Sequence, residues 1–287
     1  MQSKGQGGWI VLILIVLGVA AYFVFFGGTF QWGGAPPGGT GTGKGLVVSE
    51  IKSDSQVKPG NTTMIVAKLT NNGYADATNI EVTLQGLTTE WKIDGQSLTP
   101  DSNKREVTLS IIPGHNSTTQ AHSGNVSWNL TAPSIITTGL SYPFTVKAKY
   151  SYWTVYESVV RITSSTSKDN GRVLDQKSSD APIEVKINTN SIFKAGTNPV
   201  NVQFIFTNSG GGQVALGKLS IARNVGFTCP SYDVTFGTDA SGNPLNQVNT
   251  TCTISASVSG DFTDVNLIMY ASYDYLTKRD GSIKVSQ

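Results

Sequence analysis

The chain has 287 residues, which is enough for about two ordinary domains. Charged residues make up 14% of it, against roughly 25% in average globular proteins, and the net charge is only +2. This balance gives no one-signed field to gather phosphates, so we expect no nucleic-acid partner. With two histidines and two cysteines, the chain also has too few ligands for a typical metal cluster, and we expect no metal or cofactor.

The first predicted element is an apolar segment at residues 9–26, WIVLILIVLGVAAYFVFF, which contains no charge. A helix of this length rises about 27 Å and can span a bilayer. Lys4 and the amino terminus precede it, and the next charge is Lys44. The positive-inside rule therefore predicts that residues 1–8 are cytoplasmic and that the chain after residue 26 lies outside the cytoplasm. The localisation that follows is the cell membrane, with a single pass.

A cleaved signal and a processed prepilin-like signal are the two alternatives to a retained anchor. A cleaved secretory signal has a shorter apolar region and a small-residue cleavage site, whereas Ala20 and Ala21 are followed by large apolar residues. The run Lys4-Gly5-Gln6 resembles the class III signal of archaeal prepilins, in which a peptidase cuts after the glycine. That resemblance implies processing between Gly5 and Gln6.

Residues 27–45 form a spacer rich in glycine and proline, with no helical or strand period. Within it, Gly38 to Lys44 fits the spacing of a phosphate-binding loop. Gly45 then stands where a serine or threonine must reach magnesium, and neither a buried strand before the loop nor a helix after it is indicated. We therefore expect no nucleotide, and a flexible connection between membrane and folded part.

After Lys44 the chain consists of short alternating segments rich in Val, Ile, Thr and Tyr, which predicts an all-β fold. The expected strands lie near 46–53, 63–70, 79–85, 105–112, 124–131, 143–152 and 156–163, then near 183–188, 200–207, 214–222, 232–236, 250–258, 264–275 and 281–286. Seven strands in roughly 100 residues is typical of an immunoglobulin-like β-sandwich. We expect two tandem sandwiches after the transmembrane α-helix, at 46–163 and 182–287, with residues 164–181 as the linker.

An internal repeat supports this division. Thr70-Asn71-Asn72-Gly73 returns as Thr207-Asn208-Ser209-Gly210, and Ala148-x-Tyr150-x-Tyr152-x-Thr154 returns as Ala271-x-Tyr273-x-Tyr275-x-Thr277. Alternation in the late strand of each copy then predicts one buried face. Its members are Phe144, Val146, Ala148 and Tyr150 in the first copy and Leu267, Met269, Ala271 and Tyr273 in the second.

Residues 57–84, VKPGNTTMIVAKLTNNGYADATNIEVTL, resemble the start of the CARDB-type domain, named for cell adhesion in bacteria, and of related immunoglobulin-like domains of archaeal envelope proteins. The segment WNLTAP at 128–133, ahead of the strand at 142–146, is similar to one in those archaeal relatives. The resemblance covers 46–163 and, more loosely, 183–286. It implies an immunoglobulin-like fold and an envelope setting, and it brings no catalytic residue.

The only cysteines are Cys229 and Cys252. Outside the cytoplasm they can oxidise, and a loop of this size contributes roughly 3 kcal/mol in the chain-entropy model. We predict a disulfide, with two unpaired core thiols as the alternative.

Five N-x-S/T sequons mark candidate sites of N-glycosylation: Asn61, Asn116, Asn125, Asn129 and Asn249. Two of them, Asn125 and Asn129, share a strand face with Ser127, opposite the apolar residues of the same strand. A glycan on either asparagine is expected to point to solvent.

The sequence shows no catalytic constellation. His115 and His122 are expected in a solvated loop, no G-x-S-x-G motif occurs, and we expect that the protein is not an enzyme. The four repeat tyrosines, 150, 152, 273 and 275, could form a sugar-stacking surface, although core packing is the favoured interpretation.

The leading hypothesis is therefore a membrane-anchored, extracytoplasmic structural or adhesion glycoprotein of the cell envelope, non-catalytic, held by residues 9–26. Its expected partners are other envelope or filament proteins or surface glycans. A filament subunit similar to archaeal pilins and archaellins, processed after Gly5, is the first alternative. A surface carbohydrate-binding module is the second.

Overall fold

The computed structural model describes residues 43–99, 104–115, 120–135, 139–196 and 199–286, and Gly39–Gln287 form one compact unit. The expected cytoplasmic terminus, the apolar helix, the Gly5-Gln6 processing site, most of the spacer and Asn116 lie outside the described residues. In the described ranges every regular element is a β-strand, which confirms the all-β prediction. The same ranges contain no helix that is long and apolar enough to cross a membrane.

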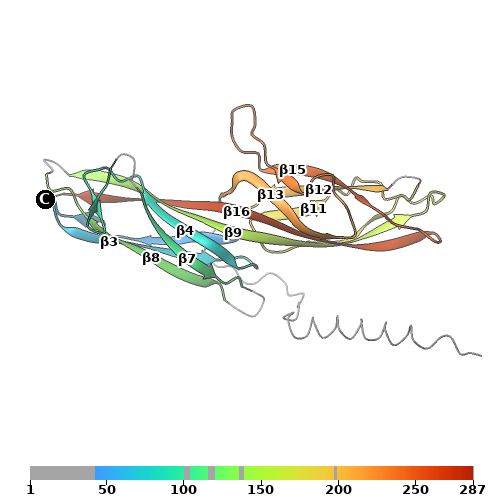
Figure 1. Ribbon diagram of the computed structural model, residues 1–287, viewed down its shortest axis with the longest axis horizontal. Helices are drawn as coiled ribbons and strands as arrows, with labels where there is room; N and C mark the ends of the chain where they lie inside the picture. The colour runs from blue at the N-terminus through green and yellow to red at the C-terminus, as the bar shows by residue number, and fades with distance from the viewer. Residues whose placement is uncertain (1–42, 100–103, 116–119, 136–138, 197–198, 287) are drawn as a thin grey trace, which may run out of the picture. The chain divides into compact units, whose positions relative to one another are not determined.

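The described strands form three sheets (Figure 1). The five-stranded sheet has the order β1 (Leu46–Lys52), β3 (Thr62–Asn71), β8 (His122–Thr131), β5 (Lys92–Ile93) and β6 (Gln96–Ser97). The three-stranded sheet consists of β11 (Ile183–Ile187), β12 (Val200–Asn208) and β15 (Gln247–Ile254). The eight-stranded sheet has the order β14 (Asp233–Thr235), β13 (Gln213–Val225), β16 (Phe262–Val285), β9 (Leu140–Thr163), β4 (Ala77–Gln85) and β7 (Lys104–Ile112), with β10 (Arg172–Ser178) paired to β9 and β2 (Gln56–Val57) paired to β16.

The two longest strands, β9 and β16, connect the sequence repeats. Each has 24 residues, and they pair antiparallel along their whole length, side by side in Figure 1. Ser151 pairs with Asp274 at the middle of this ladder. These two residues are also equivalent positions in the repeat, so a local pseudo-twofold axis relates the two copies at this pair.

The strand boundaries differ here from the sequence-based prediction. The strands expected at 143–152 and 156–163 are one strand, β9, and those expected at 264–275 and 281–286 are one strand, β16. No turn intervenes because each strand supplies the other with backbone partners through the expected breaks. Residues 164–181, expected as a linker, contain β10, which pairs with β9. The predicted bounds 46–163 and 182–287 thus separate the copies in sequence, whereas one sheet joins them in space.

The core lies on one face of the long strands. In β9 every even-numbered residue from Tyr142 to Ile162 is buried. On this face the Leu46 amide of β1 donates a hydrogen bond to Tyr150, and the Ile183 carbonyl of β11 accepts one from Thr154. The two smaller sheets therefore cover the same side of the large sheet. The predicted core face is confirmed, because all eight of its members are at most 6% exposed.

Candidate functional site

Two turns, one in each repeat, show how the fold uses the residues that the repeat shares. In the first turn the Asn71 amide donates to the carbonyls of Ala75 and Ile112, at 2.8 and 3.0 Å. Its Oδ1 accepts from the Gly73 amide at 3.1 Å and from the Tyr152 hydroxyl at 3.3 Å. The side chain of Asn71 therefore satisfies the turn that follows β3.

The second copy repeats this arrangement. The Asn208 amide donates to the Gly212 carbonyl at 2.9 Å, and its Oδ1 accepts from the Gly210 amide at 3.3 Å and the Tyr275 hydroxyl at 2.7 Å. Tyr275 in turn accepts from the Gly212 amide at 3.0 Å. The matching contacts around Asn71 and Asn208 confirm that the sequence repeat is a structural repeat.

The other two repeat tyrosines hold the first strand of each copy. The Tyr150 hydroxyl accepts from the Leu46 amide at 3.1 Å, and the Tyr273 hydroxyl accepts from the Ile183 amide at 3.3 Å. Burial raises the pKa of Tyr150 and of Tyr273 well above the usual range of a phenol. These groups stay protonated at neutral pH and act as structural hydrogen-bond partners.

The sugar-stacking interpretation of the four repeat tyrosines is wrong. Their side chains are at most 6% exposed, and their rings contact one another at centroid distances of 5.7 to 6.3 Å. A sugar cannot reach a ring face that is packed against other rings, so these residues are core.

The opposite, outer face of the eight-stranded sheet carries a cluster of polar side chains at the pseudo-twofold axis. Lys149 Nζ lies 3.7 Å from a Glu81 carboxylate oxygen and 3.8 Å from one of Asp274. The Ser151 hydroxyl donates to Asp274 at 2.8 Å and accepts from the Asn79 amide at 3.3 Å. The cluster therefore presents fixed donors and acceptors on an uncovered sheet surface.

Next to this cluster three aromatic rings form a row on the same face. Trp153 of β9 lies 6.4 Å from Tyr74 and 6.0 Å from Tyr270 of β16, between ring centroids. The Arg223 guanidinium lies 5.8 Å from the Tyr270 centroid. Partial burial, and then the negative charge of Glu157, raise the pKa of Tyr74. This row was not predicted from the sequence, although alternation alone places Trp153 opposite the buried tyrosines of β9.

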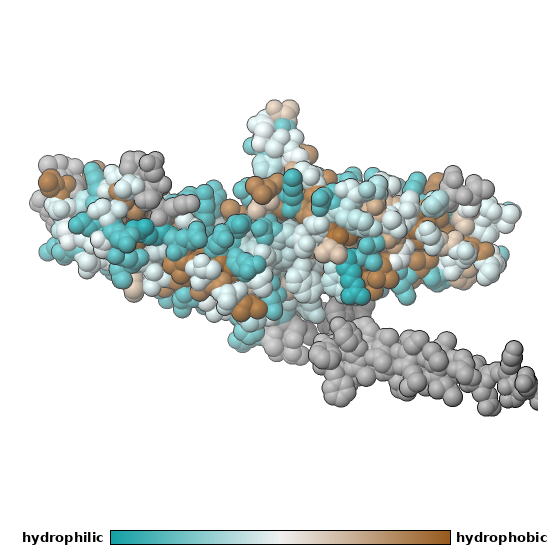
Figure 2. All heavy atoms as spheres, viewed as in Figure 1, coloured by the Kyte–Doolittle hydropathy of each residue, from teal (hydrophilic) through white to brown (hydrophobic). Residues whose placement is uncertain are grey.

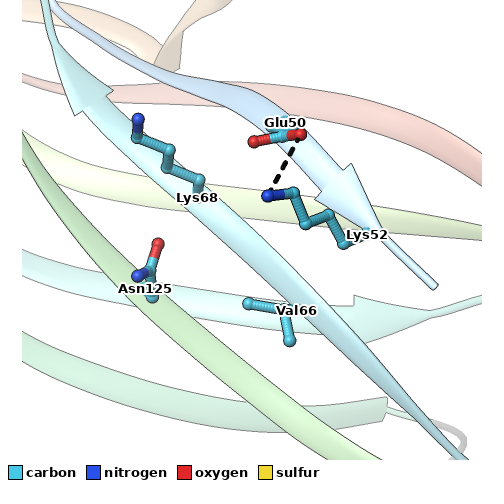
Figure 3. Close-up of a pocket in the computed structure, with 5 residues that line it drawn as sticks. All are labelled: Glu50, Lys52, Val66, Lys68 and Asn125. Atoms are coloured by element: carbon cyan, nitrogen blue, oxygen red, sulfur yellow. Dashed lines mark ion pairs between the residues drawn. The ribbon is translucent and has the colours of Figure 1, made fainter.

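A shallow depression of about 250 Å³ lies on the outer face of the five-stranded sheet (Figure 3). It is lined by Glu50, Lys52, Val66, Lys68 and Asn125, and Glu50 and Lys52 form an ion pair of 3.6 Å. The lining mixes both signs of charge with one apolar side chain. Its lining does not resemble a catalytic constellation, and it includes the sequon residue Asn125.

The predicted disulfide is confirmed. Cys229 and Cys252 are bonded, with their Cα atoms 4.2 Å apart and both side chains buried. The neighbouring residues Thr228 and Thr253 exchange two backbone hydrogen bonds of 2.8 and 2.7 Å. The bridge therefore fixes the segment before β14 to the edge strand β15.

The remaining candidate residues lie apart from one another. The described sequon asparagines, Asn61, Asn125, Asn129 and Asn249, are exposed, and in β8 the apolar residues between the two sequons are buried as expected. His115 Nδ1 lies 3.1 Å from the Gly73 carbonyl oxygen. His122 begins strand β8 and is not in a loop, which corrects its expected position.

Comparison with known proteins finds no matching protein-family model and no matching curated protein. Among solved structures the chain is similar to red sea bream transglutaminase, with 10% sequence identity and a TM-score of 0.21. The match covers 83% of this chain and 31% of the transglutaminase, so the chain spans about a third of that structure's length. That structure is an enzyme, and the expectation that this protein is not an enzyme is not carried into the function proposed below.

Proposed function

We propose that the protein is a structural or adhesion protein of the cell envelope, attached to the membrane by residues 9–26 with its N-terminus in the cytoplasm and its folded part outside. The disulfide between Cys229 and Cys252 carries this proposal. Disulfides form and persist in oxidising compartments and are rare in the cytosol. An uncharged segment of eighteen residues ahead of a disulfide-bonded β fold is the arrangement expected of an anchored external protein.

The attachment of the spacer to the fold supports a mechanical role. The Asn72 amide donates to the Gly45 carbonyl at 2.9 Å, and Lys44 lies 3.7 Å from Asp180 in an ion pair. Leu46 then donates to the buried Tyr150, close to the pseudo-twofold axis. Force applied through the spacer would therefore pass into the first repeat and into the segment 164–181 between the repeats.

We further propose that each repeat is an immunoglobulin-like unit of the CARDB type. The support is the resemblance at residues 57–84 and the layered packing of one smaller sheet on one part of the large sheet in each repeat. The exchange of long strands between the units is a departure from a simple tandem arrangement. It makes the pair of units a single rigid element, which suits a spacer or adhesive module.

Protease added to intact cells tests the location. We expect cleavage in the glycine-rich spacer at residues 27–45 and release of a fragment that carries both repeats, because segments of small and polar residues are preferred sites of proteolysis. Protection of the repeats together with accessibility of residues 1–8 would reverse the orientation and refute the envelope location.

The mature N-terminus separates this proposal from a filament subunit, which the sequence Lys4-Gly5-Gln6 favours. Mass spectrometry of the purified protein should find Met1 if the helix is a retained anchor. A chain beginning at Gln6 would show prepilin-like processing and favour the filament.

A further inference from the structure

We propose that the outer face of the eight-stranded sheet, centred on Trp153 and Tyr270, binds a neutral oligosaccharide. This site names a partner class for the adhesive role proposed above and rests on that role for its biological setting. It differs from the sugar-stacking interpretation of the sequence, because the rings involved lie on the opposite face of β9 from the repeat tyrosines.

The first support is the geometry of the aromatic rings. Trp153 stands opposite Ser272 in the ladder, and Tyr270 stands opposite Val155, so the two large rings are diagonal neighbours on one sheet face. Their planes are inclined by 35°, and the ring of Tyr74 contacts that of Trp153 at an interplanar angle of 86°. The row therefore forms a shallow, angled surface, which can receive the apolar C–H faces of a bent sugar chain.

The second support is the polar cluster beside the rings. Ser151 is two residues from Trp153 on β9, and Asp274 is two residues beyond Ser272 on β16, so both point to the same face as the rings. Lys149, Glu81 and Asp274 remain 43, 44 and 45% exposed although they are ion-paired. Their free lone pairs and N–H groups can bind hydroxyls, which act as both donors and acceptors.

The charges of this surface select against other ligand classes. The site has two positive side chains, Lys149 and Arg223, and three negative ones, Glu81, Glu157 and Asp274. It therefore has no excess of positive charge to bind a phosphorylated or sulphated polymer. Polar side chains such as Ser151 and Asp274 adjoin the rings, and Figure 2 shows hydrophobic residues in separate patches among hydrophilic ones on the visible face. A ligand with one apolar and one hydroxylated side fits this mixture better than an apolar protein surface does.

Glycan binding can be measured on the full-length protein kept in amphipol or zwitterionic detergent, since sugar-based detergents would compete. The probes are immobilised hexasaccharides of glucose, mannose, galactose and N-acetylglucosamine, followed by calorimetry with the best of them in solution. We expect at least one to bind, and we expect Trp153→Ala and Tyr270→Ala each to weaken binding at least tenfold. Tyr232→Ala is the matched control, because Tyr232 is a 40% exposed tyrosine that precedes the edge strand β14, two strands from Tyr270, and it should bind as the unchanged protein does.

Trp153 packs partly against the core, so Trp153→Ala is compared by thermal unfolding with the unchanged protein. Tyr270→Ala is the decisive variant if Trp153→Ala unfolds, because Tyr270 is not part of that core. Absence of binding to all four hexasaccharides, or equal loss in Tyr232→Ala and Tyr270→Ala, would overturn the proposal. Neither result would affect the envelope location, which the protease experiment tests separately.

Discussion

Ser151 and Asp274 face each other across β9 and β16, joined by a hydrogen bond of 2.8 Å, and they are also equivalent residues of the two repeats. A residue that pairs with its own counterpart marks a twofold axis. The chain therefore resembles a fused dimer in which each copy extends its last strand along the other copy. Because this exchange joins the repeats in one sheet, we expect the two repeats to stabilise each other and to unfold together.

Separate expression of residues 46–163 and 182–287 tests the exchange. Each fragment would expose the long edge of β9 or β16, whose backbone groups are paired only in the intact chain. We expect each fragment to self-associate or aggregate, and the two to form a stable complex when co-expressed. Light scattering of the separated fragments checks this, and two monomeric fragments that unfold cooperatively would contradict it.

The two Asn–Tyr turns should contribute similarly to stability. Asn71→Ala would leave two carbonyls and the Gly73 amide without their partner in a buried turn, so we expect a loss of about 2 to 4 kcal/mol. Tyr275→Phe removes only a hydroxyl, and we expect about 1 kcal/mol. Chemical denaturation measures both changes, with the exposed Tyr232→Phe as the control. An Asn71→Ala protein as stable as the control would show that the turn is held by other contacts.

Reduction of the disulfide should destabilise the whole folded unit. The lost loop constraint corresponds to roughly 3 kcal/mol in the chain-entropy model. Treating 182–287 as an independent domain predicts that the first repeat keeps its melting temperature. Because the two repeats share a sheet, we expect instead a single unfolding transition whose melting temperature falls for both repeats together. Calorimetry with and without reductant distinguishes the two, and Cys229→Ser/Cys252→Ser protein should show no further shift on adding reductant.

Much of this fold could be predicted from the sequence, because alternation reports which face of a strand is buried. It identified the core face that contains Ala148 and Ala271, and the sequence repeat identified Asn71 and Asn208 as equivalent positions. Strand pairing is different, since local alternation does not say which strands become neighbours or in which register. For this reason the continuity of β9, the exchange with β16 and the meeting of Trp153 with Tyr270 required the structure.

Alkaline pH should unfold the protein through its buried tyrosines. Burial raises the pKa of Tyr275 to about 12, above its ordinary value near 10, and also raises that of Tyr152. The folded state thus keeps protons that the unfolded state releases, so stability is complete below about pH 10 and is lost as the pH rises towards 12. Circular dichroism and tyrosinate absorbance should change together in this interval. Tyr275→Phe should reduce the slope of stability against pH there, and an unchanged slope would exclude Tyr275 as a contributor.

Substitutions on the two faces of the long strands test the register on which these inferences depend. Ala148 and Ala271 are fully buried, so Ala148→Lys or Ala271→Lys would place a charge and a long side chain in a packed core. We expect a loss of several kcal/mol, or no folded protein, in either case. Ser272→Lys is the control, because Ser272 lies on the partly exposed outer face and should tolerate the change. Since β9 and β16 share one ladder, the damage from Ala271→Lys should extend to the first repeat, and hydrogen exchange can show this in amides of β4. Protection of β4 at its original level in a protein with an unfolded second repeat would mean that the two copies fold independently despite their shared sheet.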